Sequence, residues 1–278
     1  MDSRLLLRAA AAAAIVAGAE ALRLRDLPRR IRRKADATPV TDSDLAANEL
    51  IEGELRGIGY PLVSEESDQI DYESRRRWHR MWMIDPLDGT KEYIEGGDGF
   101  TVNIALVERG VAQLGVVYLP GEDTLYLGVV GGGAWVITAA RTRISDDRSW
   151  TTLPRTDARN RPVTIVASKH HYSRQTEQFV EASRRRHPDL QLIHASSSLK
   201  LCAIADGAAD YYPRCGPTME WDTAAGDAIL RAVEGRVVGW NSRRRLRYNK
   251  RSLRNPSFIA VASGQRLPSP LTDIAAAD

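Results

Sequence analysis

Four β-rich segments lie close together between Trp82 and Ile137, and they limit the possible fold more than any other feature of the sequence. The segments are FTVNIALVERG, VAQLGVVYLP, DTLYLGVV and GAWVI. Only short turns with Gly, Pro and Asp separate them, and such turns leave no room for crossover helices. We therefore expect an antiparallel meander over this part of the chain.

The second half of the chain has a different pattern. Strand-like segments (PVTIVAS, LQLIH, ADYYP, RVVGW and SFIAVA) are interspersed with helix-like ones (RQTEQFVEASRRR, SLKLCAIADG and WDTAAGDAILRAVEG). Strands alternating with helices indicate an α/β layer. The polar stretch from residue 144 to 161 contains Pro154 and is interpreted as a linker. We expect an α+β half over residues 1–150 and an α/β half over residues 151–278.

The N-terminal residues are rich in leucine and alanine, which raises the question of a signal peptide or a membrane span. Arg8 interrupts the apolar run, and Glu20, Arg23 and Arg25 follow it without a break. Apolar residues recur at helical spacing at Leu5, Ala9, Ala12, Ile15, Val16, Ala19 and Leu22. We expect an amphipathic first helix with these residues as its apolar stripe, and no run long enough to span a membrane.

Carboxylates occur at the ends of predicted elements in four separate places. In MIDPLDGTKEYIEG, two of them follow a buried strand and lie three residues apart. The full set is Asp44 at the start of a helix predicted over residues 43–56, Glu65 after the strand YPLVS, Asp85 and Asp88 in the quoted loop, and Asp222 at the start of the WDTAAG helix. Each alone is a common helix cap or turn residue. Close like charges repel and are costly to desolvate, so we expect a cation between them.

Hard divalent cations such as Mg²⁺ prefer oxygen ligands, and converging carboxylates therefore predict a magnesium site. Two ions in such a site can activate water and stabilise a leaving oxygen. In the quoted loop, Asp85 could bridge the ions and the Leu87 carbonyl could add a ligand. The amides of Gly89 and Thr90 could approach a phosphate, and the Thr90 hydroxyl could orient the attacking water. The spacing Asp-x-x-Asp-Gly-Thr is one residue longer than the motif of haloacid-dehalogenase-type phosphatases, which argues against their covalent chemistry.

WMIDPLDGT together with EWDTAAGDAIL resembles the two signatures of the inositol-monophosphatase-like, lithium-sensitive phosphatases. The longer stretches KADATPVTDSD, SSSLKLCAIADGAADYYPRCGPTMEWDTAAG and NPSF resemble the CysQ-type 3′(2′),5′-bisphosphate nucleotidase branch, and the likeness covers residues 6–262. The resemblance implies a layered α-β-α-β-α sandwich of the inositol monophosphatase/fructose-1,6-bisphosphatase type, with the site between the two halves. It also implies Mg²⁺-dependent removal of the 3′-phosphate of adenosine 3′,5′-bisphosphate by activated water, with two or three ions. The sulfated relative of that nucleotide is the expected second substrate.

The resemblance also assigns roles by position. Metal ligands are expected at Glu65, Asp85, the Leu87 carbonyl, Asp88 and Asp222, and the water-activating group is expected to be Thr90 with Asp44 or Glu65. Substrate contacts are expected at Gly89, Thr90, His171, Ser197, Lys200, Arg214 and Asp222. Lys200 and Arg214 suit a substrate with two phosphates. The chain departs from the family at Ser196, where Gly is usual, and at Lys169 and His170, where Arg and Ser are common.

The nearest alternative is an inositol monophosphatase or another sugar-phosphate phosphatase of the same fold, which has less need of Lys200 and Arg214. An alternative from another class is a nucleic-acid or anionic-surface binder that uses arginine clusters such as residues 184–186 and 243–245. The net charge of +3 gives little support to nucleic-acid binding. We expect a small-molecule nucleotide partner, no nucleic acid and no integral membrane segment. The expected location is the cytoplasm, free or peripheral at the inner face of the cell membrane. The sequence leaves monomer and homodimer open.

Overall fold

The computed structural model describes residues 2–27, 31–33, 39–156, 161–169 and 172–268. Its helices are α1 (Ser3–Arg25), α2 (Asp42–Arg56), α3 (Tyr72–Arg75), α4 (Thr90–Ile94), α5 (Ala140–Arg143), α6 (Arg174–Arg186), α7 (Leu199–Ala205) and α8 (Trp221–Ala232). Short 3-10 turns cover Pro120–Glu122 and Asp147–Ser149. Helix α2 begins with a capping box, in which Thr41 and Asp44 each bind a backbone amide of the other.

The first half forms a seven-stranded sheet whose strand order follows the chain. Its strands are β3 (Leu62–Ser64), β4 (Arg80–Asp88), β5 (Thr101–Glu108), β6 (Val111–Leu119), β7 (Thr124–Val129), β8 (Gly133–Thr138) and β9 (Thr151–Thr152). Strands β4 to β9 pair antiparallel, and β3 pairs parallel with β4. The predicted meander is confirmed.

The second half forms a five-stranded sheet in the order β11-β10-β12-β14-β13. Its strands are β10 (Thr164–Ser168), β11 (Gln191–Ala195), β12 (Tyr211–Arg214), β13 (Arg236–Gly239) and β14 (Phe258–Val261). Strand β10 runs parallel to both β11 and β12, whereas β14 runs antiparallel to β12 and β13. A separate small hairpin pairs β1 (Ile31–Arg33) with β2 (Pro39–Thr41).

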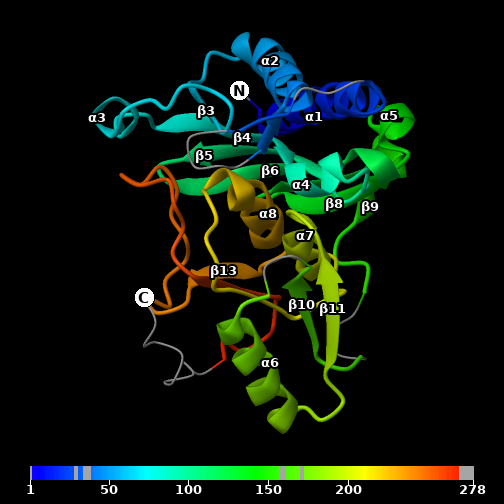
Figure 1. The fold of residues 1–278 in the computed structure, drawn as a ribbon, viewed down its shortest axis with the longest axis vertical. Coiled ribbons are helices and arrows are strands. Elements are labelled where there is room, and N and C mark those ends of the chain that lie inside the picture. The colour runs from blue at the N-terminus through cyan, green and yellow to red at the C-terminus, as the bar shows by residue number, and fades with distance from the viewer. Residues whose placement is uncertain (1, 28–30, 34–38, 157–160, 170–171, 269–278) are drawn as a thin grey trace.

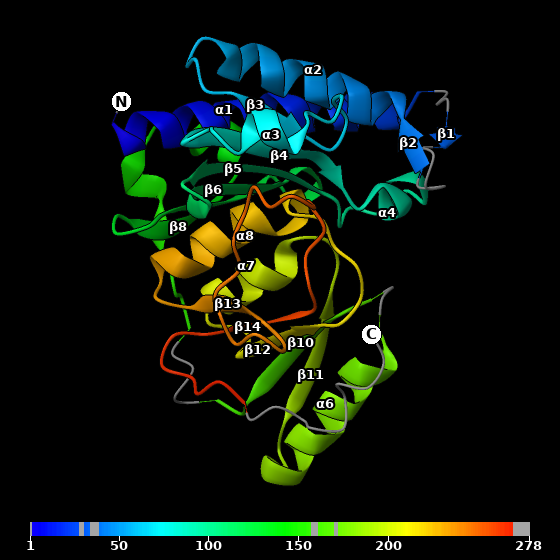
Figure 2. The same cartoon turned by 90° about the vertical axis from the view of Figure 1, so that its left-hand side faces the viewer.

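The elements stack in five layers, which Figures 1 and 2 show from two sides. Helices α1 and α2 cover the outer face of the seven-stranded sheet, α7 and α8 lie between the two sheets, and α6 lies beyond the five-stranded sheet. The expected α-β-α-β-α sandwich is confirmed.

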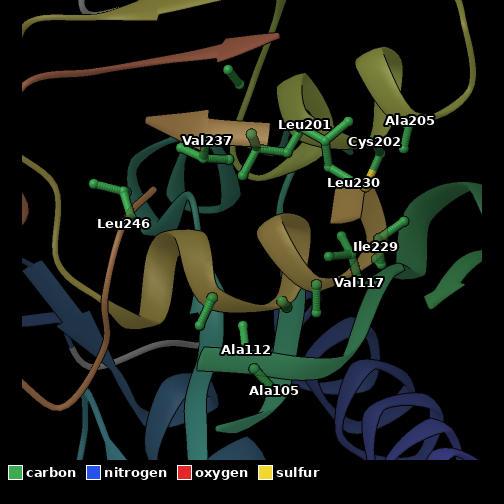
Figure 3. Packing of buried hydrophobic residues seen from close by; sticks show 14 of the residues in the cluster. Ala105, Ala112, Val117, Leu201, Cys202, Ala205, Ile229, Leu230, Val237 and Leu246 are labelled. Atoms are coloured by element: carbon green, nitrogen blue, oxygen red, sulfur yellow. The ribbon is translucent and has the colours of Figure 1, made fainter. Parts of the chain in front are cut away.

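Both sheets pack on the middle helices α7 and α8. In Figure 3, Leu201 of α7 and Ile229 of α8 lie in one apolar cluster with Val117 of the seven-stranded sheet and Val237 of the five-stranded sheet. Because this core is common to both halves, the division of the chain near residue 150 stays a prediction.

Helix α1 exists as predicted, but the predicted face is wrong. Leu5 and Val16, expected in the stripe, are exposed, and the buried side is largely alanine. Small side chains let α1 lie close to the sheet, and a Cβ added at Gly18 would come within 2.6 Å of the Tyr118 ring. No apolar run long enough to span a membrane was expected, but by length and composition alone α1 could cross one. Half of its most apolar 18-residue stretch is buried inside the fold.

Two other expectations need correction. The predicted linker is partly structured, since α5 ends at Arg143 but a 3-10 turn and β9 follow it, and β9 pairs with β8.

The Asp85–Asp88 stretch is not a turn after the strand. It stays paired to β5 through a register shift between Asp85 and Asp88. Pro86 cannot donate a ladder hydrogen bond, which accounts for an irregularity at this point.

Candidate active site

Three carboxylates from different elements meet between the two sheets. Glu65 follows β3, and Asp85 lies on the neighbouring strand β4, one residue beyond the paired Ser64 and Ile84. Asp222 comes from the first turn of α8. One oxygen from each carboxylate lies within 4.8 Å of the others. The structure thus brings together three of the predicted metal ligands.

Burial and mutual repulsion dominate the electrostatics of this acidic group. Burial raises the pKa of Asp85 well above its usual value, and the charges of Glu65 and Asp88 raise it further. Burial and the neighbouring Asp88 raise the pKa of Asp222 in the same way. A bound cation would relieve both penalties, and the set consists of the hard oxygen donors that Mg²⁺ prefers. The residues therefore fit a divalent metal ion.

Asp88 lies beside this group and accepts from Asn103 on β5 and from Ser198, the residue that precedes α7. Burial raises its pKa, while the nearby Lys200 charge opposes the rise. Ser198 Oγ donates to Asp88 Oδ2 over 3.1 Å and lies 2.8 Å from the Asp222 carbonyl oxygen. Asn103 Nδ2 also donates to Ser198 Oγ over 2.9 Å. Ser198 therefore links the Asp85–Asp88 stretch to the start of α8.

Asp44 and Thr90 form a second polar unit next to the acidic group. Thr90 Oγ1 lies 3.1 Å from Asp44 Oδ1 and 3.3 Å from the Leu87 carbonyl oxygen. The other Asp44 oxygen accepts from the amide and the hydroxyl of Thr41, at 2.7 and 2.5 Å. Burial raises the pKa of Asp44 despite these hydrogen bonds. The capping box of α2 thus fixes a proton acceptor against the Thr90 hydroxyl.

Gly89 allows the chain to turn sharply between Asp88 and Thr90. Its φ of 96° lies in the left-handed region, and a Cβ at this position would lie 2.4 Å from Ser197 Oγ. Ser197 Oγ donates to the Asp88 carbonyl oxygen over 2.9 Å. The predicted contact residues Gly89 and Ser197 therefore also join the two halves of the site.

A cleft of about 240 Å³ leads away from the acidic group. Asp88 and Asp222 line one part of it, and Lys200 and Arg214 line another. Lys200 Nζ donates to the carbonyls of Ser197 and Ala195 at 2.5 and 3.4 Å, and burial lowers its pKa to about 8. Acidic and basic groups thus face one space, as a metal-assisted phosphatase for a doubly anionic substrate would require.

Of the predicted site residues, only His171 lies outside the described residues. Sequence reasoning did not assign roles to Ser198 and Asn103. The Ser196–Ser198 run was a visible signal for Ser198, but Asn103 lies within an ordinary strand pattern. Its importance depends on its pairing with Asp85 across β4 and β5.

Comparison with known proteins agrees with this geometry. The sequence pattern of the inositol monophosphatase family matches residues 2–273. The chain belongs to the inositol monophosphatase family. Within it, the chain is 38% identical over 234 residues to a protein of Shigella flexneri and to one of Escherichia coli K12, each named 3′(2′),5′-bisphosphate nucleotidase CysQ. Each alignment covers 83% of this chain and 88% of the relative.

Solved structures of the family support the same placement. The crystal structure of CysQ from Bacteroides thetaiotaomicron is similar, with a TM-score of 0.83 and 39% identity. The match covers 92% of this chain and 97% of that one. SuhB from Bartonella henselae has a TM-score of 0.72 at 23% identity, and this likeness shows the fold alone. The predicted family resemblance, including its CysQ-type branch, is confirmed.

Proposed function

We propose that this enzyme is a Mg²⁺-dependent 3′(2′),5′-bisphosphate nucleotidase that hydrolyses the 3′-phosphate of adenosine 3′,5′-bisphosphate to AMP and phosphate. The observation that carries the proposal is that carboxylates and two buried cations, Lys200 and Arg214, line different parts of the same cleft. The names of the relatives at 38% identity support this substrate class. We extend the proposal to the 5′-phosphosulfate analogue, because it presents the same 3′-phosphate.

In this proposal, the metal ligands are Glu65, Asp85, the Leu87 carbonyl, Asp88 and Asp222. Bound Mg²⁺ supplies charge neutralisation and Lewis acidity toward the reacting phosphate. The carboxylates hold that charge next to the Gly89 turn, and the amides of Gly89 and Thr90 are available to phosphate oxygens.

The chain's own acid–base group is the Asp44–Thr90 unit. When Thr90 donates its proton toward Asp44, its oxygen lone pairs are free to accept a hydrogen bond from the attacking water. The water proton then passes to Thr90 as the threonine proton passes to Asp44, so the hydroxyl ends unchanged. The raised pKa of Asp44 makes it a better proton acceptor than an exposed aspartate. Glu65 is the alternative base, because it lies near enough to Asp44 for its charge to help raise the pKa of Asp44.

The test is phosphate release from adenosine 3′,5′-bisphosphate, inositol 1-phosphate and fructose 1,6-bisphosphate, with Mg²⁺ and with or without Li⁺. We expect the highest kcat/KM with the nucleotide and inhibition by Li⁺. A preference for inositol 1-phosphate would reject the nucleotidase and favour the inositol phosphatase alternative. Hydrolysis that persists unchanged in excess chelator would reject metal dependence.

A further inference from the structure

Three polar side chains lie at the carboxyl ends of the parallel strands β10, β11 and β12 in the five-stranded sheet. Ser168 ends β10, Arg214 ends β12, and Ser196 follows the end of β11. Strand β10 lies between the other two and runs parallel to both. Ser168 and Arg214 each lie three residues beyond the paired Ile165 and Tyr211. All three polar residues line the cleft, as expected where ligands meet the carboxyl ends of parallel strands.

The hydroxyl of Ser196 is buried without a hydrogen-bond partner among the described residues. Only 7% of the residue is exposed. A buried hydroxyl without a partner is costly, and native structures keep few of them. Since this hydroxyl belongs to a residue that lines the cleft, a ligand in the cleft can provide the missing partner.

The groups around Ser196 define the chemistry of that ligand. Arg214 Nε is also buried without a partner within the described part of the chain, although its guanidinium donates to the Pro217 carbonyl oxygen over 3.0 Å. The Lys200 ammonium donates to the carbonyl oxygens of Ala195 and Ser197, the residues on either side of Ser196. A guanidinium N–H and an ammonium donate only, and a hydroxyl can donate. The matching ligand atom is an anionic oxygen.

We propose that Ser196 is a specificity-determining residue that donates a hydrogen bond, beside Arg214, to the phosphate of the substrate that does not react. This inference rests on the proposed nucleotidase function and adds a residue to it. The carboxylate group at the other part of the cleft would hold the reacting phosphate, so Ser196 has no role in bond breaking. Its contribution should therefore appear in KM and not in kcat, and only with substrates that carry the second phosphate.

The test compares Ser196→Ala with wild type on adenosine 3′,5′-bisphosphate and adenosine 3′-monophosphate, which share the reacting group. We expect kcat/KM for the bisphosphate to fall about 10-fold through KM, as for a lost hydrogen bond to a charged group, and to change less than about 2-fold for the monophosphate. The melting temperature should not fall, because the hydroxyl has no described protein partner. Ser183→Ala is the matched control, since its hydroxyl bonds the Phe179 carbonyl on α6, away from the cleft. Equal changes on both substrates, or none, would overturn the inference.

A binding measurement separates this inference from the proposed function. Calorimetric titration of 5′-AMP and of adenosine should show about 10-fold weaker binding of 5′-AMP to Ser196→Ala, with adenosine unaffected. If wild type does not hydrolyse the bisphosphate, the nucleotidase proposal fails, and the 5′-AMP titration alone decides whether Ser196 binds a phosphate. Unchanged 5′-AMP affinity in the variant would reject the role of Ser196, whatever the activity of the enzyme.

Discussion

Asp85 combines burial with several acidic neighbours, and this combination is unfavourable unless a positive charge is added. Its carboxylate accepts from the Leu87 amide over 3.1 Å, which is the only hydrogen bond to it among the described residues that offsets its raised pKa. A buried carboxylate among other carboxylates lowers the stability of the fold, so stability alone does not explain the position of Asp85. At the scale of single residues, Asp85 therefore gives the clearest test of the metal proposal.

Asp85→Asn should reduce turnover below about a tenth of wild type at saturating Mg²⁺, because it removes the central proposed ligand. The fold should stay intact, and the metal-free variant should melt no lower than metal-free wild type, since one repelling charge is gone. The measurements are phosphate release and thermal unfolding. Asp189→Asn, at an exposed position, is the control for loss of a carboxylate. Retention of most activity in Asp85→Asn would contradict the proposal.

Arg214 and Lys200 have similar charges but different surroundings. Lys200 holds the Ala195–Ser197 backbone, so its removal would disturb the cleft wall as well as the charge. Arg214→Ala is the cleaner test, and it should lower kcat/KM for adenosine 3′,5′-bisphosphate by roughly 10- to 150-fold. The loss for a small monophosphate should be much smaller. Equal losses on both substrates would show that Arg214 supports the fold or the general phosphate site.

At the scale of elements, α1 shows how small residues decide which face of a helix is buried. Its alanine side contacts α2 and the seven-stranded sheet, while the larger Leu5 and Val16 face outward. Close approach of backbones increases packing contacts for both partners. Hydrophobicity alone therefore gives the wrong face for this helix.

Gly18→Ala and Gly53→Ala form a matched pair that tests this packing. Both glycines lie within helices, but a Cβ at Gly18 would lie 2.6 Å from the buried Tyr118 ring, whereas a Cβ at Gly53 has nothing within 4 Å. We expect Gly18→Ala to lower the free energy of unfolding by about 1–3 kcal/mol through overpacking. Gly53→Ala should raise it by about 0.5–1 kcal/mol through helix propensity. Urea unfolding measures both, and a stabilised Gly18→Ala variant would show that α1 does not pack this closely.

At the scale of the whole molecule, the acidic group links stability to pH and metal. The folded, metal-free protein holds protons on Asp85, Asp88 and Asp222 more tightly than the unfolded chain does, because all three pKa values are raised. The folded state therefore binds more protons, and its metal-free stability falls as pH rises from about 4 through the folded pKa values. In the proposed function Mg²⁺ would replace those protons, so its binding would be favoured at higher pH.

Mg²⁺ should therefore raise the melting temperature more at about pH 8 than at about pH 5. At a hundredfold excess over its Kd, the added stability is about 2.7 kcal/mol for one site. Thermal unfolding with chelator and with Mg²⁺ at both pH values measures this difference. Asp85→Asn should reduce it. An equal increase at both pH values would show that Mg²⁺ does not compete with protons at these carboxylates.

The sequence predicts the order of the elements well because local patterns determine it. The meander after Trp82 and the strands and helices of the second half follow from spacing and turn residues. The Asp85–Asp88 stretch was expected to be a turn, because its pairing with β5 is a contact between distant residues. The role proposed for Ser196 was equally hidden. It depends on β10 lying between β11 and β12, which no local pattern reveals.

The shared middle layer also has a consequence for the newly made chain on the ribosome. The seven-stranded sheet is complete at Thr152, but the helices that cover its inner face begin only at Leu199 and Trp221. Synthesis proceeds at roughly 5–20 residues per second, so the inner apolar face of the sheet stays exposed for several seconds before α7 and α8 are synthesised. During that interval the exposed apolar face makes the nascent protein prone to aggregation. The apolar face that is fully buried in the finished enzyme is thus the last part of this sheet to be covered during its synthesis.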